Sequence, residues 1–345
     1  MDILLLFLAR FLLSELYGVN PQIILLIAFL LLIYNFITSP IEFLRITNDH
    51  KKYFIAISLL LIISLFNIDI YSILNILILL ILPFIKYKSY NYSKYISFFV
   101  LISTIIYCIL IITNFSIYMN RSHNYLLLGR GVLVCQAIFL FTNFQRLKYF
   151  KLPISLLFLV GLSIMHGRLN AIVSLLLIIL YLLKNFKYSW ILLLSTGFIS
   201  TLLISFISTL NIGTVKRLLN DQDSISDRVG LVQTASTELQ NIQTLFFGGG
   251  IDFSQTIAFE TLGYPYIHNL PLELLLDYGL FAVPILLIWI LMLVRSSKII
   301  LLKKEILLPV LLFVETLQFF KSFEFDQSIS LFLIITLLIN QKNEL

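Results

Sequence analysis

One polar segment interrupts an otherwise apolar chain, and it holds the residues best suited to chemistry. Within it, Ser224 and Asp227 have the Ser-x-x-acid spacing that predicts the start of a helix, and Arg228 follows at once. An arginine in the first turn adds a planar donor fork to the unpaired backbone N–H groups, a combination suited to phosphate oxygens. The alternative is a solvated arginine paired with Asp223 or Asp227.

Two further features of this segment are candidates for ligand binding. The run Gly248–Gly250 allows positive φ or a close approach of the backbone to a ligand, and a plain helix stop is the alternative. His268 and Asn269 immediately precede the next apolar stretch, where Asn269 is expected to cap a helix with Pro271 in its first turn. His268 then acts either as a base near neutral pH or only as an interfacial hydrogen-bonding residue.

Several charged residues fall inside or beside apolar stretches. Arg168 lies at a predicted tight turn in the sequence HGRLN, while Arg130 and Glu315 lie within predicted spans. A charge in such a place is costly and usually faces the interior of a helix bundle, so these residues are candidates to line an intramembrane cavity. Pairing with a neighbouring helix, or extension of the Arg168 side chain to the headgroups, is the alternative.

The residue patterns of the sequence do not predict a metal or cofactor site. Cys108 and Cys135 both lie in apolar runs, and no His, Cys or carboxylate cluster has zinc spacing. Asp221-Gln222-Asp223 has the Asp-x-Asp form of metal-dependent nucleotide-sugar transferases, but its place before a helix cap favours a solvated turn. No metal and no other cofactor is expected.

The elements that must position these residues are membrane helices. The 345 residues are 59% hydrophobic and 12% charged, with a mean hydropathy of +0.99, which predicts an all-α polytopic membrane protein. The net charge of +6 is scattered over short loops, so nucleic acid is not an expected partner. We expect about twelve transmembrane helices, at residues 3–18, 21–38, 53–68, 70–85, 95–113, 125–144, 152–166, 169–183, 190–210, 270–294, 306–320 and 327–340.

The distribution of Lys and Arg among the loops predicts the orientation of these helices in the membrane. Most Lys and Arg residues fall in alternate loops, which places both termini in the cytoplasm and the long loop, residues 211–269, on the outer face. A single integral membrane domain, 1–345, would then comprise a nine-helix bundle (1–210), this loop and a three-helix segment (270–345). Short amphipathic helices are expected in the loop, and an apolar stripe about 16–20 residues long predicts one of them as a helix lying on the membrane surface. Its members are Val229, Val232, Leu239, Ile242 and Phe246.

The order of these elements resembles the bacterial O-antigen polymerase and O-antigen ligase superfamily. In that family a membrane-edge arginine precedes a large outer loop, which begins with an arginine, continues to Gly-x-Gly and ends in His-Asn before a Leu-rich helix. The corresponding residues are Arg168, Arg228, Gly248, Gly250, His268, Asn269, Leu272, Glu273, Leu275, Gly279 and Leu280. The match covers about residues 160–295; Gly167 stands before Arg168, where the family usually has Ser.

The resemblance implies a metal-independent glycosyltransferase in the bacterial cytoplasmic membrane. Its donor and acceptor would be oligosaccharides on polyprenyl pyrophosphate, joined into O-antigen or capsular polysaccharide beside membrane lipids, a flippase and a chain-length regulator. His268 and Arg228 would be catalytic. Pyrophosphate and glycan would be bound by Arg168, Arg228, Gly248, Gly250, Asn269 and Glu273. The alternatives are the ligase of the same superfamily, a flippase for the lipid-linked glycan and a noncatalytic scaffold.

Overall fold

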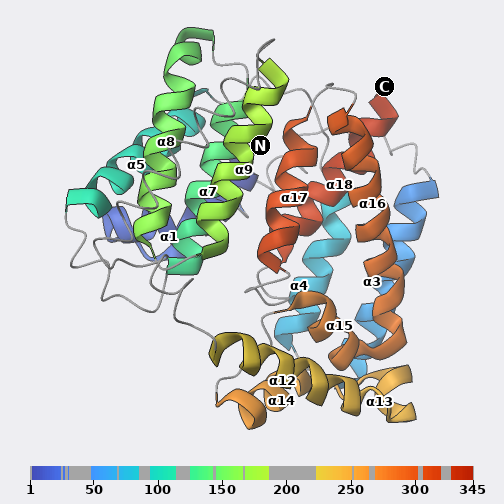
Figure 1. Cartoon of the computed structure of the whole chain (residues 1–345). Helices are drawn as coiled ribbons and strands as arrows, with labels where there is room; N and C mark the ends of the chain where they lie inside the picture. Colours follow the sequence, from blue (N-terminus) through green and yellow to red (C-terminus); the bar gives the residue numbers. More distant parts are fainter. Residues whose placement is uncertain are drawn as a thin grey trace. The chain divides into compact units, whose positions relative to one another are not determined.

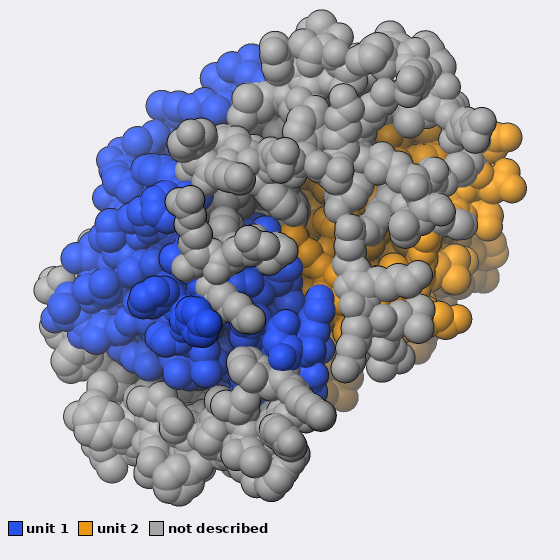
Figure 2. All heavy atoms as spheres, turned by 90° about the horizontal axis from the view of Figure 1, so that it is seen from above, with its two compact units in different colours: residues 1–31, 90–221 blue, residues 32–89, 222–345 orange. Residues whose placement is uncertain are grey.

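The structure is a computed structural model, and the residues that it describes are 2–24, 26–27, 30, 48–67, 70–84, 94–113, 125–142, 145–165, 168–185, 223–250, 252–263, 269–301, 306–319 and 328–344. Within these ranges the regular structure is helical and contains no strand, which confirms the all-α prediction. The chain divides into two compact units, each described by itself (Figure 2). Unit 1 comprises residues 1–31 and 90–221, and unit 2 comprises residues 32–89 and 222–345.

Unit 1 is a bundle of apolar helices around α7. The helices are α1 (Asp2–Tyr17), α5 (Lys94–Thr113), α7 (Tyr125–Phe141), α8 (Lys151–Ile164) and α9 (Arg168–Asn185), with the 3-10 helix η2 (Gln145–Phe150) before α8. α7 packs against the other four, and its residues 128–140 are all buried, as expected of a helix that is apolar on every side. The Lys151 ammonium donates to the carbonyls of Leu140 (2.9 Å) and Thr142 (2.7 Å), which satisfies acceptors at the end of α7.

Unit 2 contains helices that cross it in alternating directions. They are α3 (Asn48–Asn67), α4 (Ile70–Ile81), α16 (Val283–Leu301), α17 (Leu307–Phe319) and α18 (Ile329–Glu344). At one end, His50 shares a hydrogen bond with Asn340 (2.6 Å), and the Asn340 amide donates to the carbonyl of Pro83 (3.3 Å) in the 3-10 helix η1 (Leu82–Phe84). These contacts join the start of α3, the end of α4 and the end of α18. At the other end, the Ser64 hydroxyl donates to the Tyr278 hydroxyl (3.5 Å).

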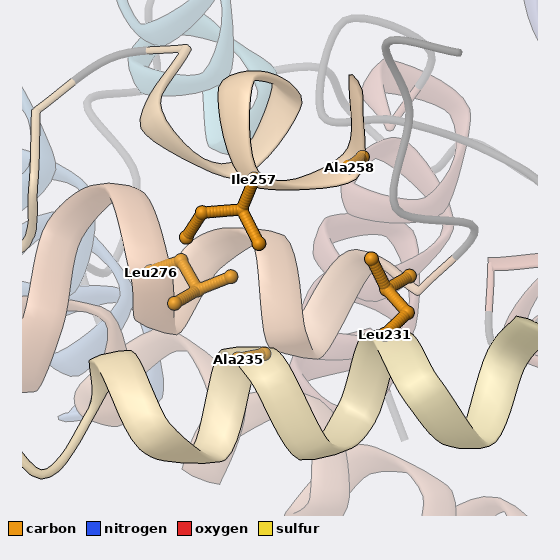
Figure 3. Packing of buried hydrophobic residues seen from close by; sticks show 5 residues of the cluster. All are labelled: Leu231, Ala235, Ile257, Ala258 and Leu276. Atoms are coloured by element: carbon orange, nitrogen blue, oxygen red, sulfur yellow. The ribbon is translucent and has the colours of Figure 1, made fainter. Parts of the chain in front are cut away.

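Four short helices cover that second end of unit 2 (Figure 1). They are α12 (Asp223–Glu238), α13 (Ile242–Phe247), α14 (Phe253–Leu262) and α15 (Leu270–Tyr278), and residues 223–278 are called the platform from here on. α12 and α14 pack together and against α15, while α13 packs against α15 and the 3-10 helix η3 (Gly279–Ala282). The platform has its own apolar core (Figure 3), formed by Leu231, Ala235, Ile257, Ala258 and Leu276, with Leu239, Phe253 and Leu272 packed against it.

The helix expected from the Ser224–Asp227 spacing is confirmed as α12. It buries Leu231 and Ala235, while Val229 and Val232 of the predicted stripe are exposed. A turn at residues 239–241 then separates α12 from α13, which begins at a cap in which the Asn241 side chain accepts the N–H of Gln243 (3.0 Å).

Helices occupy most of the predicted spans, but twelve crossings remain a prediction. The range 190–210 and most of 21–38 lie outside the described residues. In the part of the chain that the structure describes, one run, Leu270–Ile300 of 31 residues, is both long and apolar enough to cross a membrane. Gly279 (φ 58°, ψ −141°) divides this run into α15, η3 and α16. α16 alone has 19 residues, about 28 Å of helix. Shorter apolar helices of 10–17 residues occupy Phe98–Thr113, Leu127–Phe141, Lys151–Ile164, Leu169–Asn185, Leu307–Phe319 and Ile329–Asn340.

Candidate functional site

Asn269 caps α15 as the sequence predicts. Its side-chain oxygen accepts the N–H of Leu272 (3.1 Å), and Pro271 occupies the first turn, where no N–H is needed. His268 lies outside the described residues.

The sequence position of Arg228 in α12 can be related to two residues of the platform core. It precedes Leu231 by three residues and Ala235 by seven, and both of these side chains are in the platform core. Residues three and seven apart have nearly the same register on an α-helix, so Arg228 shares the register of these two residues.

α12 and α15 run in the same direction across the platform. α13, which follows α12, packs against η3, which follows α15, and the N–H of Gly249 donates to the carbonyl of Leu276 (2.8 Å). In Figure 3, Leu276 lies beside Ala235. Arg228 and Asn269 precede these two residues by seven positions each, about 10 Å of helix in both cases. Arg228 and Asn269 therefore both lie on the N-terminal side of this contact.

α15 begins directly after its Asn269 cap, whereas α12 begins at Asp223, five positions before Arg228. Arg228 therefore lies in the second turn of α12, and the prediction that it lies in the first turn is wrong. The unpaired N–H groups of a helix N-terminus favour an anion, and the capped start of α15 is such an end. Of the predicted site residues, Arg228 and Asn269 lie on the N-terminal side of the platform core, and His268 is not among the described residues.

The glycine turn lies at the opposite end of the platform. Gly248 (φ 78°) fits directly against the Asp277 carbonyl and the Tyr278 N–H, where any Cβ would collide with backbone. A Cβ on Gly279 would likewise meet the backbone of Gly248 and Leu245. Gly250 also has positive φ (97°). These glycines therefore join α13 to the start of η3 by direct backbone packing, and substrate binding by Gly248 and Gly250 stays a prediction.

Asp277 holds the start of α14. Its carboxylate accepts the backbone N–H of Ser254 (2.8 Å) and the Ser254 hydroxyl (3.1 Å), and Asp277 and Ser254 are 6% and 1% exposed. Asp252, at the N-cap position, has left-handed backbone and does not cap the helix with its side chain. A neighbouring helix thus supplies the cap of α14. Sequence reasoning did not assign this role, because the two partners are 23 positions apart.

Glu273 is the other buried acid of α15, one turn before Asp277 and nearer to Asn269. Because the two residues are four apart, their side chains leave the same face of the helix. The Asp277 carboxylate bonds to α14, so this pair divides into an acid that fixes the platform and an acid beside its N-terminal end. The predicted contact of Glu273 with the glycan remains compatible with that place.

The remaining predicted residues lie elsewhere. Arg168 begins α9 of unit 1. Arg130 is buried in α7 of the same unit, and the neighbouring Gly129 lets the Asn170 side chain of α9 approach the α7 backbone. The positions of Arg130 and Arg168 are therefore on adjoining turns of packed helices. In unit 2, Glu315 of α17 is fully buried and accepts a hydrogen bond from the Ser330 hydroxyl of α18 (2.9 Å).

No cluster of three or more His, Cys, Asp or Glu side chains suited to a metal ion occurs among the described residues. Both cysteines are free and buried. No protein-family model, curated protein or solved structure matches the chain.

Proposed function

We propose that this chain is an integral membrane glycosyltransferase that joins polyprenyl-pyrophosphate-linked oligosaccharide units into a surface polysaccharide. The observation that carries the proposal is the packing of α12 and α15 in the same direction, which puts Arg228 and Asn269 on the N-terminal side of the platform core. A phosphate-binding arginine and a histidine base are thereby attached to one end of a single small scaffold.

The chemistry follows from those two groups. A hydroxyl of the acceptor sugar attacks the anomeric carbon of the donor, forming a new glycosidic C–O bond while the bond to pyrophosphate breaks. His268 takes the hydroxyl proton, and Arg228 with the helix N-termini stabilises the negative charge that grows on the departing lipid pyrophosphate. Water exclusion and the binding of the glycan itself then depend on neighbouring groups such as Glu273.

The direction of the unit 2 helices supports an outer position for the platform. Lys51 and Lys52 lie in the first turns of α3, and Arg295 and Lys298 lie in the last turns of α16. Both places are at the end of the bundle marked by the His50–Asn340 hydrogen bond, away from the platform. Because Lys and Arg collect on the cytoplasmic side of membrane proteins, this distribution favours an external platform, where lipid-linked repeat units are polymerised.

The test is a gel profile of the surface glycan in cells that lack the gene and carry either wild type, Arg228→Ala, His268→Ala or Arg295→Ala. We expect deletion to leave a single repeat unit on its carrier and wild type to restore the ladder. Arg228→Ala and His268→Ala should fail to restore it at normal protein levels. Arg295→Ala removes the same charge at the opposite end of the bundle, and we expect it to restore the ladder.

Other outcomes identify the competing functions. Loss of the single-unit band on deletion would replace the polymerase with the ligase or flippase of the same process. A full ladder from both Arg228→Ala and His268→Ala would remove these residues from the site, and a scaffold would become the better description.

A further inference from the structure

α13 is a short helix whose surface is almost wholly apolar and exposed. Its sequence is IQTLFF, and Ile242 is 74% exposed and Phe247 59% exposed, with Leu245 and Phe246 also exposed. Thr244 is the buried residue of the helix. The outward face of α12 differs, because its exposed Val229 and Val232 alternate with polar side chains, among them Gln233 and Ser236.

Backbone packing and a hydrogen bond determine the position of α13 relative to α15 and η3. The turn that follows it is packed backbone to backbone against the start of η3 through Gly248 and Gly279, and the Gly249 N–H donates to the Leu276 carbonyl. The Phe247 ring lies 6.2 Å from the Phe281 ring of η3, measured between centroids. The aromatic side chains are therefore presented at a defined place beside the start of α16.

The apolar surface continues from α13 onto α16. Leu280 of η3 is exposed, and so are the side chains of α16 that follow it, namely Leu287, Ile290, Leu291 and Val294. These residues belong to the one described run that is long and apolar enough to cross a membrane. A bilayer that surrounds α16 would reach α13 at the point where the platform begins (Figure 1).

We propose that α13 is inserted in the outer lipid leaflet, at the boundary between headgroups and acyl chains, and anchors the platform there. This inference rests on the proposed function, since it needs α16 to span the membrane with the platform outside. The occupant of the surface is bilayer lipid, because the surface is continuous with α16 and α13 carries no charged side chain. Arg228 and Asn269, on the same rigid scaffold, are thereby held at a constant depth relative to lipid-linked substrate.

The experiment uses the full-length protein in phosphatidylcholine and phosphatidylglycerol vesicles with an environment-sensitive fluorophore on one introduced cysteine. The sites are Phe247→Cys in α13, Leu291→Cys in α16 and Gln233→Cys on the outward face of α12, all of which are exposed. The native Cys108 and Cys135 are buried, and the labelled parent protein gives the background. Each probe is quenched by spin-labelled lipid with a shallow or a deep label, and separately by aqueous iodide.

We expect the probe at position 247 to be quenched at least about twofold more by shallow lipid labels than the probe at position 233. The probe at position 291 should respond most to the deep label, and the probe at position 233 most to iodide. Strong iodide quenching at position 247 would overturn the inference by showing a watery surface. Protection of position 247 from both lipid and iodide would also overturn it, because another protein or a second copy would then cover α13. In either case, lipid quenching at position 291 would still support the proposal that α16 spans the membrane. Its absence would refute the proposed function as well.

Discussion

The two ends of the platform are built in different ways. At the C-terminal end of α15, Gly248 and Gly279 bring two backbone segments into direct contact, and the Asp277 carboxylate caps α14. Packing and hydrogen bonding account for the identity of these residues. At the N-terminal side, the Asn269 side chain caps α15, and Arg228 lies in the second turn of α12. The residues that hold the platform together are therefore different from the residues proposed to bind substrate and catalyse its reaction.

The largest expected effect is at the packed end. Gly248→Ala adds a Cβ where it collides with the Asp277 and Tyr278 backbone, at a positive φ, so we expect a loss of ~3 kcal/mol or more in stability, seen as a lower Tm of the purified protein in detergent. Gly263→Ala is the comparison variant, since Gly263 also has positive φ (75°) but nothing within 4 Å of the added Cβ. Its ψ of 10° is that of a left-handed residue, whereas the ψ of 171° at Gly248 is open essentially only to glycine, which adds to the cost there. Gly263→Ala should cost only about 1–2 kcal/mol, the strain of a left-handed residue. Equal losses for the two variants would contradict the backbone contact.

The next effect tests the other end. Arg228→Lys keeps the charge but removes the planar fork that binds two phosphate oxygens at once. We expect the initial rate of polymer formation from purified lipid-linked repeat units to fall about 100-fold, or about 2.7 kcal/mol in transition-state stabilisation, with little change in Tm. An unchanged rate would mean that the N-terminal end supplies charge without bidentate recognition.

A smaller effect distinguishes the two buried acids of α15. Asp277→Ala leaves the Ser254 N–H without its acceptor, so stability should fall by about 2 kcal/mol. Glu273→Gln preserves the shape of that side chain and should change the Tm little while lowering the polymerisation rate. The measurements are thermal unfolding and the rate assay on both variants. A lower Tm for Glu273→Gln together with a lower rate for Asp277→Ala would assign stability to Glu273 and the reaction to Asp277.

The smallest effect is expected from Ser254→Ala. This change removes the 3.1 Å bond from the Ser254 hydroxyl to Asp277 and keeps the 2.8 Å bond from the backbone N–H. The cost should be about 1 kcal/mol, and the rate of polymer formation should stay at the wild-type level once protein amounts are matched. A large rate loss with an unchanged Tm would assign Ser254 to the reactive end rather than to the packed one.

Local signals in the sequence predicted the starts of the platform helices well. The Ser224–Asp227 spacing anticipated α12, and Asn269 with Pro271 anticipated the cap of α15, because caps depend on residues three or four apart. The bend at Gly279 was not predictable from residues 270–294, whose apolar character continues through it. That bend depends on contact with Gly248, which is 31 positions earlier in the chain.

The buried face of α12 was also beyond local reasoning. The stripe through Val229 and Val232 is as apolar as the pair Leu231 and Ala235, and only the presence of Ile257, Ala258 and Leu276 determines which side is covered. The Ser254–Asp277 pair is similar, since neither residue carries a local mark of its partner. The apolar surroundings of Arg130 and Glu315 could be predicted from the sequence, but the residues of the neighbouring helices could not.

The contacts within the platform join residues that are near one another in the chain. Gly249 and Leu276 are 27 positions apart, and Ser254 and Asp277 are 23 positions apart. Elements whose contacts are close in sequence close small loops and fold quickly. The platform can thus assemble from its own segment as soon as Tyr278 has been synthesised, before α16, α17 and α18 are complete. Folding of the platform would then precede completion of the helix bundle that it covers.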